Sequence, residues 1–178
     1  KTKAVFDEHI AALVAAGVDL LIPETFSSLE EARLCLACCK KTEVPTMVLL
    51  GTGGMDGTED GVSHSEAARM LVDDGADIVG LVCNADPPTM WPKVLEMRQA
   101  VDAPIAFQPH GYRTDLNWSA VEEGAEVPGS EMAEYALKAE AEGINFVGAC
   151  CGAGPSHIRA MARALRGEVV APWSKKEE

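Results

Sequence analysis

The chain has 178 residues, of which 47% are hydrophobic and 24% charged, a mixture typical of a folded globular protein rather than a disordered one. Its 15 basic residues are outnumbered by 28 acidic ones, for a formal net charge of −13. A surface of that sign repels phosphate backbones, so no nucleic-acid partner is expected.

The sequence shows no sign of a membrane span or of export. No apolar run approaches the ~20 residues that cross a bilayer, and residues 1–15 lack the pattern of a secretory signal. We therefore expect a cytoplasmic protein with no membrane partner. Its six cysteines are then expected to be thiols or metal ligands rather than disulfides.

Apolar periodicity and capping residues predict an alternation of helices and strands. Ser28 with Glu31, and Ser63 with Glu66, fit the capping box that starts a helix, and Pro155 fits a first helical turn. We predict helices at 2–16, 28–41, 63–74, 88–101, 129–142 and 154–166. We predict strands at 18–25, 46–51, 76–83, 103–109 and 144–151.

Three segments repeat one pattern, in which a glycine, a small or branched residue and Asp or Asn lead into an apolar run. They begin at Gly17, Gly75 and Gly143. The pattern is typical of a helix that ends at a glycine and turns tightly into a buried strand. Continuous apolar strands separated by helices imply a parallel sheet with right-handed crossovers.

The number and spacing of the strands leave two α/β architectures open. The strands recur at about the 30-residue interval of one βα unit, but eight units and ~250 residues are needed to close a barrel. Five strands therefore indicate either an open, doubly wound sheet or the C-terminal part of a (βα)8 TIM barrel. The chain begins on a helix, which favours the partial barrel.

Three cysteines lie at the expected carboxyl ends of strands, where loops line the site in both architectures. Cys83 ends one strand, and Cys150 and Cys151 end another. Thiolates suit Zn²⁺, and three protein ligands leave its fourth position open, as in catalytic zinc sites. Strand neighbours point to opposite faces, but Gly152 lets the chain turn so that both sulfurs converge. Ordinary buried cysteines are the alternative at this point.

Residues 80–83 read Gly-Leu-Val-Cys, and residues 148–152 read Gly-Ala-Cys-Cys-Gly. Together with three further segments, they resemble the homocysteine S-methyltransferase family, in its betaine–homocysteine branch. The first is similar to the family's Gly-x-Asn-Cys segment and the second to its Gly-Gly-Cys-Cys-Gly segment. The helix at 155–159 matches the one that follows. Residues 108–114 resemble the Gln-Pro-x-x-Tyr-x-Thr stretch of the betaine branch, and residues 22–26 its strand-end Glu segment. Order and spacing agree across nearly the whole chain.

The resemblance implies a (βα)8 TIM barrel of which the chain carries only the C-terminal part, about strands 4–8. Residues 1–168 then form an N-terminally incomplete homocysteine-binding domain, and residues 169–178 a tail. The implied cofactor is Zn²⁺, held by Cys83, Cys150 and Cys151. The implied activity is zinc-dependent methyl transfer from a small, betaine-like onium donor to the thiol of homocysteine, giving methionine. A homo-oligomer of the full-length protein is left open.

The same resemblance implies the substrate contacts. Glu24 is a candidate to hold the ammonium group of homocysteine, and the rings of Phe26 and Tyr112 are candidates to face a cationic donor. Plain packing is the alternative for both rings, and a solvated strand-end carboxylate is the alternative for Glu24. Val82 stands where the family has Asn, which removes an amide near the metal, and Ala149 stands where it has a second Gly. These departures keep open an inactive metal-binding or ligand-binding barrel fragment that lacks the N-terminal site residues.

Three further features are weaker candidates. Residues 51–54 (Gly-Thr-Gly-Gly) allow a zinc-free, phosphate-binding enzyme, although no helix is predicted directly after them. The segment 109–128 is long enough for a lid, and His110 within it is expected at the surface. Cys35 and Cys39 lie one helical turn apart, without evident further ligands for a second metal site.

Overall fold

The computed structural model describes residues 2–114 and 125–168 and confirms the predicted order of elements. The helices are α1 (Thr2–Ala15), α2 (Leu29–Cys39), α3 (His64–Asp73), α4 (Pro87–Ala100), α5 (Gly129–Ala141) and α6 (Pro155–Leu165). The strands are β1 (Glu24–Phe26), β2 (Met47–Leu50), β3 (Ile78–Val82), β4 (Ile105–Gln108) and β5 (Phe146–Val147). The predicted tail and the middle of the predicted lid lie outside the described residues.

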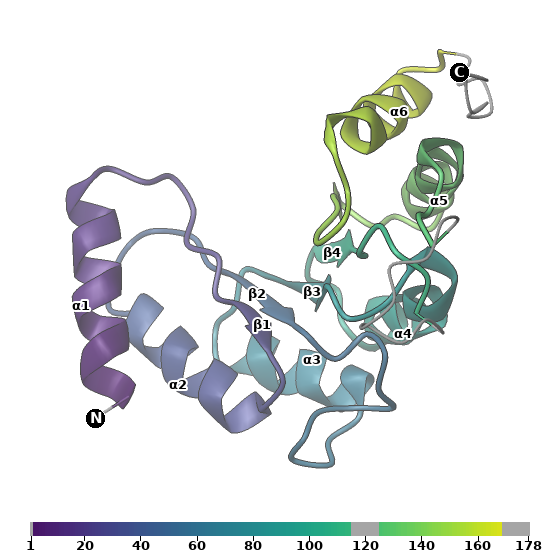
Figure 1. Cartoon of the computed structure of the whole chain (residues 1–178). Coiled ribbons are helices and arrows are strands. Elements are labelled where there is room, and N and C mark those ends of the chain that lie inside the picture. Colours follow the sequence, from purple (N-terminus) through teal and green to yellow (C-terminus); the bar gives the residue numbers. More distant parts are fainter. Residues whose placement is uncertain (1, 115–124, 169–178) are drawn as a thin grey trace.

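The five strands form one parallel sheet in the order β1-β2-β3-β4-β5. A doubly wound sheet would reverse its strand order at a switch point, with helices on both faces. Here each strand lies beside the next in sequence, and the helices run around one side of a curved sheet (Figure 1). The architecture is an arc of a βα barrel, as the partial-barrel prediction requires.

The helix ends follow the predicted capping chemistry. The Ser28 hydroxyl accepts a hydrogen bond from the Glu31 N–H, and Ser63 accepts one from Glu66. The glycines that precede the strands are left-handed, with φ of 81° at Gly17 and 96° at Gly75, where a side chain would be strained. Within the described residues, no helix is both long and apolar enough to cross a bilayer.

The pleat divides the strand side chains between two apolar layers. The layer that faces the helices contains Val48, Leu50, Val79, Leu81, Ile105 and Phe107. The inner layer contains Met47, Leu49, Ile78, Val82 and Ala106. Burial on both faces explains why these strands are continuous apolar runs in the sequence.

The two outermost strands are much shorter than predicted. For 18–25 the structure has only Glu24–Phe26, preceded by a single bridge between Leu21 and Thr46, and for 144–151 only Phe146–Val147. Within the described residues, each of these strands pairs on one side only. Thr25 at φ 63° also interrupts the regular ladder of β1. Apolar composition predicted where these strands lie, but ladder pairing decides where they end.

The helix-facing layer is expected to carry much of the stability. Leu71 of α3 is fully buried in it, at 0% exposure, whereas Leu13 of α1 is 44% exposed. Replacing Leu71 by Ala should lower the free energy of unfolding by about 2–5 kcal/mol, because it removes buried methyl groups and leaves a cavity. The matched Leu13→Ala change should cost less than about 1 kcal/mol. Equal losses in urea unfolding would contradict this assignment of the core.

Candidate metal centre

The structure brings together the three cysteines at the carboxyl edge of the sheet. Cys83 follows directly after β3, while Cys150 and Cys151 lie in the turn after β5. The Cys151 sulfur is 3.5 Å from that of Cys83 and 3.8 Å from that of Cys150, and all three lie within 4.8 Å of one another. Among the described residues, this is the one group of three such side chains with the spacing to hold a metal ion.

The Cys83 turn has an unusual backbone. Cys83 and Asn84 both have φ of 59°, a left-handed conformation that is rare outside glycine. The Asn84 side-chain amide donates to the Gly51 carbonyl at 2.5 Å, which holds the turn against the loop after β2. Two successive left-handed residues turn the chain sharply at the end of β3.

The glycines of residues 51–54 make this contact possible. A Cβ on Gly54 would lie 2.6 Å from the Asn84 carbonyl oxygen, and one on Gly53 would lie 3.2 Å from that of Cys83. The helix α3 begins only at His64, so no helix starts directly after the glycines. In the structure these glycines pack closely against the Cys83 turn, and no helix N-terminus lies directly after them.

A glycine also shapes the second sulfur-bearing turn, as the sequence predicted. Gly152 has φ of 78°, and a Cβ there would lie 2.2 Å from Cε2 of the Tyr112 ring. The ring of Tyr112 therefore lies directly against the turn that carries Cys150 and Cys151. The regular strand has already ended at Val147, so the alternation of strand side chains does not keep the two sulfurs apart.

Residues 108–111, the last residue of β4 and the three that follow it, join the two turns through their backbone. Its hydrogen bonds are Cys83 N–H to Gln108 O (2.9 Å), His110 N–H to Ala85 O (2.9 Å), Cys150 N–H to Pro109 O (2.9 Å) and Gly111 N–H to Cys151 O (2.7 Å). A Cβ on Gly111 would lie 2.7 Å from the Gly152 carbonyl carbon, so only glycine permits this approach. This segment thus sets the distance between the two turns.

The predicted substrate residues lie in different surroundings. Glu24 pairs in register with Leu49, whose side chain belongs to the inner layer, and its carboxylate is exposed. Phe26 packs edge-to-face on Phe6 of α1, with ring centroids 6.0 Å apart, in the layer that faces the helices. Tyr112 is the aromatic candidate that the structure places beside the sulfurs, whereas the contacts of Phe26 favour the packing role.

Burial controls the protonation of the thiols. Loss of solvent raises the pKa of Cys150 to about 12, and its contact with the Cys83 thiol adds to the shift. The same two effects keep this thiol neutral at ordinary pH. A bound cation would reverse that preference, because a coordinating thiol gives up its proton.

His110 was wrongly predicted at the surface. Its side chain is only 2% exposed, and its Nδ1 accepts a hydrogen bond from the Tyr112 N–H at 3.3 Å. Burial lowers the pKa of His110. The prediction relied on the position of His110 in a long loop, but the backbone hydrogen bonds of His110 to Ala85 and of Gly111 to Cys151 hold this part of the loop against the two turns.

Sequence reasoning also missed Asp86, which accepts a hydrogen bond from the Thr89 N–H at the start of α4. An Asp directly before Pro87 and Pro88 is a helix-start signal that was available in the sequence. Its further contacts with Arg113 and Thr114 join residues nearly thirty positions apart, and no local pattern predicts them.

A partial βα barrel with three thiols at the carboxyl ends of its strands defines a class of protein: a barrel with a candidate thiolate metal site. Residues 1–165 match the sequence model of the homocysteine S-methyltransferase family. The chain belongs to that family.

Individual relatives agree with this assignment. The chain is 36% identical over 183 residues to betaine–homocysteine S-methyltransferase 1 of Danio rerio, covering 94% of this chain and 46% of the relative. It is 29% identical to the S-methylmethionine–homocysteine S-methyltransferase of Pongo abelii, covering 94% and 50%. The chain thus spans about half the length of the curated relatives it matches.

Solved structures confirm the fold. The apo form of the homocysteine methyltransferase MmuM from Escherichia coli superposes with a TM-score of 0.73 at 17% identity, covering 92% of this chain and 56% of that one. Its metallated form gives a TM-score of 0.67 at 19% identity, covering 90% and 52%. The prediction of a partial (βα)8 barrel is therefore confirmed.

The exposure of the thiols predicts their order of reaction. Cys151 is exposed, whereas Cys38 and Cys39 are buried in the cluster formed by α1 and α2, and burial raises the pKa of Cys38. In metal-free protein, iodoacetamide should label Cys151 first and reach Cys38 and Cys39 only after denaturation. Peptide mass spectrometry over time measures this order. Early labelling of Cys38 in folded protein would contradict it.

Proposed function

We propose that the protein containing this chain transfers a methyl group from a small onium donor to the thiol of homocysteine, giving methionine. The observation that carries the proposal is the spacing of the Cys83, Cys150 and Cys151 sulfurs. Membership of the homocysteine S-methyltransferase family supports the reaction class. The same three cysteines are proposed to hold Zn²⁺.

The donor set fits zinc in geometry as well as in chemistry. Tetrahedral zinc with bonds of ~2.3 Å places its sulfur ligands about 3.8 Å apart. The sulfur of Cys151 lies at 3.5 and 3.8 Å from its two neighbours, close to that value. Three thiolates leave one tetrahedral position for the sulfur of a substrate. The exposure of Cys151 and the partial exposure of Cys150 keep that side of the site accessible.

The proposed mechanism divides the work among few groups. Cys83, Cys150 and Cys151 would hold Zn²⁺, which would lower the pKa of the homocysteine thiol, so that homocysteine would react as a thiolate after its proton passed to solvent. The Glu24 carboxylate pairs with the ammonium group of homocysteine, and the Tyr112 ring faces the positive charge of the donor. A sulfur–carbon bond forms as the bond between the methyl carbon and the onium atom breaks. The donor leaves as a neutral molecule with the bonding electron pair.

A betaine-like donor is the proposed substrate class. The Danio rerio relative is named for betaine, and residues 108–114 carry the segment that resembles that branch. S-methylmethionine, named for the Pongo abelii relative, is the second candidate. The six free cysteines agree with a cytoplasmic location, and the acidic net charge agrees with small-molecule partners rather than nucleic acid.

An inactive metal-binding barrel is the competing function, and Val82 favours it. Its side chain is 1% exposed within the apolar inner layer, next to Cys83, where the family has an amide. Zinc binding without methyl transfer from betaine, S-methylmethionine or another onium donor in the intact protein would select this alternative. Methyl transfer from any of them would exclude it.

Zinc content is the direct test of the ligand set. The protein should contain about one zinc per chain, and Cys150→Ala should lose it because two thiolates cannot complete a three-cysteine site. The matched change Cys35→Ala, in α2 and outside the group, should leave the zinc in place. Elemental analysis after gel filtration measures both. Equal zinc in the two variants would refute the assignment.

Substrate kinetics test the other two contacts. Glu24→Gln should raise the KM for homocysteine while changing the KM for the donor little, because only the ammonium partner is lost. Tyr112→Leu should raise the donor KM by roughly 2- to 30-fold, the equivalent of a cation–π contact of ~0.5–2 kcal/mol. Phe26→Leu is the control, since this ring packs on Phe6. A larger donor effect at Phe26 than at Tyr112 would reverse their roles.

A further inference from the structure

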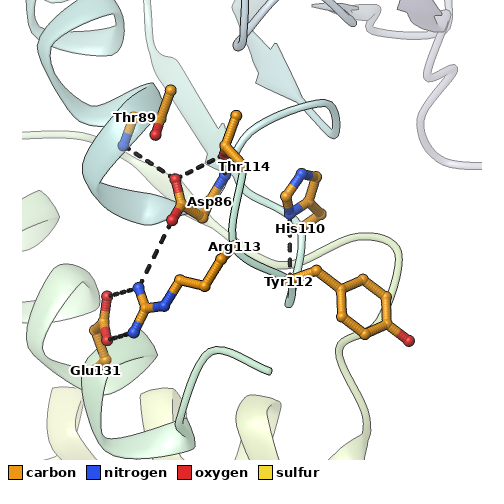
Figure 2. A network of polar contacts seen from close by, with 7 residues as sticks. All are labelled: Asp86, Thr89, His110, Tyr112, Arg113, Thr114 and Glu131. Carbon is orange, nitrogen blue, oxygen red and sulfur yellow. Dashed lines mark hydrogen bonds and ion pairs between the residues drawn. The ribbon is translucent and has the colours of Figure 1, made fainter. Parts of the chain in front are cut away.

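A buried carboxylate lies three residues after Cys83. Asp86 is only 4% exposed, and its Oδ1 accepts hydrogen bonds from the Thr114 hydroxyl at 2.8 Å and from the Thr89 N–H at 3.3 Å. The Asp86 N–H in turn donates to the Thr114 oxygen at 2.7 Å. Asp86 and Thr114 are therefore joined twice, and Figure 2 shows the pair at the centre of a larger network.

The network continues through Arg113 to another helix. The Arg113 guanidinium makes a bidentate pair with Glu131 of α5, through Nη1 at 2.6 Å and Nη2 at 2.5 Å (Figure 2). Its Nη1 also lies 3.6 Å from Oδ2 of Asp86. Bidentate arginine–carboxylate pairs fix orientation as well as distance. The turn after β3, the loop after β4 and the helix α5 are thus tied together by side chains of both charges.

The charge on Asp86 is maintained in spite of burial. Burial by itself raises the pKa of this carboxyl, but the hydrogen bonds from Thr89 and Thr114 outweigh it and hold the pKa below its usual range. An ionised, buried carboxylate requires partners, because leaving it unpaired is costly. The positions of Thr114 and Arg113 are therefore tightly constrained relative to Asp86.

This constraint reaches the sulfurs through the backbone. Residues 108–111 form hydrogen bonds to the Cys83 turn on one side and to the Cys150–Cys151 turn on the other. The Asp86–Thr114 pair adds a second link between the Cys83 turn and this segment, because Asp86 lies just after the turn and Thr114 lies just after residues 108–111. Tyr112, whose ring lies against Gly152, is held between these two attachments.

We propose that Asp86, Thr114 and Arg113 act as a positioning clamp that sets the spacing of Cys83 from Cys150 and Cys151 for metal binding. The proposal rests on the proposed function, because it assigns the clamp to the same site. None of the three residues is among the proposed zinc ligands or the proposed substrate contacts. They act through the segment 108–111, so their effect falls on metal affinity and ligand geometry.

The test compares three variants in the intact protein that carries this chain. Thr114→Val removes the hydroxyl and keeps the shape, and Thr114→Ser restores the hydroxyl. Glu134→Gln is the control, because Glu134 lies on the same helix as Glu131 but pairs only with the exposed Lys138 among the described contacts. Zinc affinity is measured by competition with a chelator, and Co²⁺ substitution gives the absorption bands of the thiolate site.

The clamp predicts a loss of zinc affinity of about tenfold or more in Thr114→Val, the size seen when outer partners of metal ligands are removed, with shifted Co²⁺ bands. Thr114→Ser and Glu134→Gln should stay within about twofold of wild type. If Thr114→Val does not fold, Arg113→Gln, whose side chain is partly exposed, serves the same comparison and should also weaken zinc binding. Wild-type affinity and bands in a folded Thr114→Val or Arg113→Gln protein would overturn the clamp alone. A wild-type protein that binds neither ion would overturn the proposed function and the clamp together.

Discussion

The arrangement of the candidate site depends on one set of backbone hydrogen bonds. Residues 108–111 leave the end of β4 and bond alternately to the turn that carries Cys83 and to the turn that carries Cys150 and Cys151. Because the peptide unit is rigid, four such bonds closely restrict the separation of the two turns. The sulfur spacing expected of a zinc site is therefore a property of the barrel edge itself.

Close packing at this edge requires unusual local structure. Among the described residues, the non-glycine residues with positive φ are Thr25, within the short strand β1, and Cys83 and Asn84, directly after β3. Such conformations cost of order 1–3 kcal/mol each and persist where surrounding contacts impose them. Gly54 and Gly111 are required for a different reason, because any side chain there would collide with neighbouring backbone. Strained residues and obligatory glycines together mark this edge as the functional one.

The departure from the family pattern at Val82 is consistent with its surroundings. The inner layer around it is apolar, formed by Met47, Leu49, Ile78 and Ala106. An amide in that layer would need a partner to offset its desolvation. The polar network around Asp86, three residues after Cys83, is the proposed support for the site in this chain.

The sequence by itself determined the alternation of helices and strands, the helix starts at Ser28 and Ser63, and the choice of three cysteines as candidate metal ligands. It could do so because periodicity, capping and residue chemistry are local properties. The tertiary structure decided where the outer strands end, because ladder pairing and not apolar composition sets their length. It also decided that His110 is buried, that Phe26 packs on α1, and that Asp86 contacts Thr114. These contacts join positions far apart in the chain, and their geometry exists only once the strands are placed side by side.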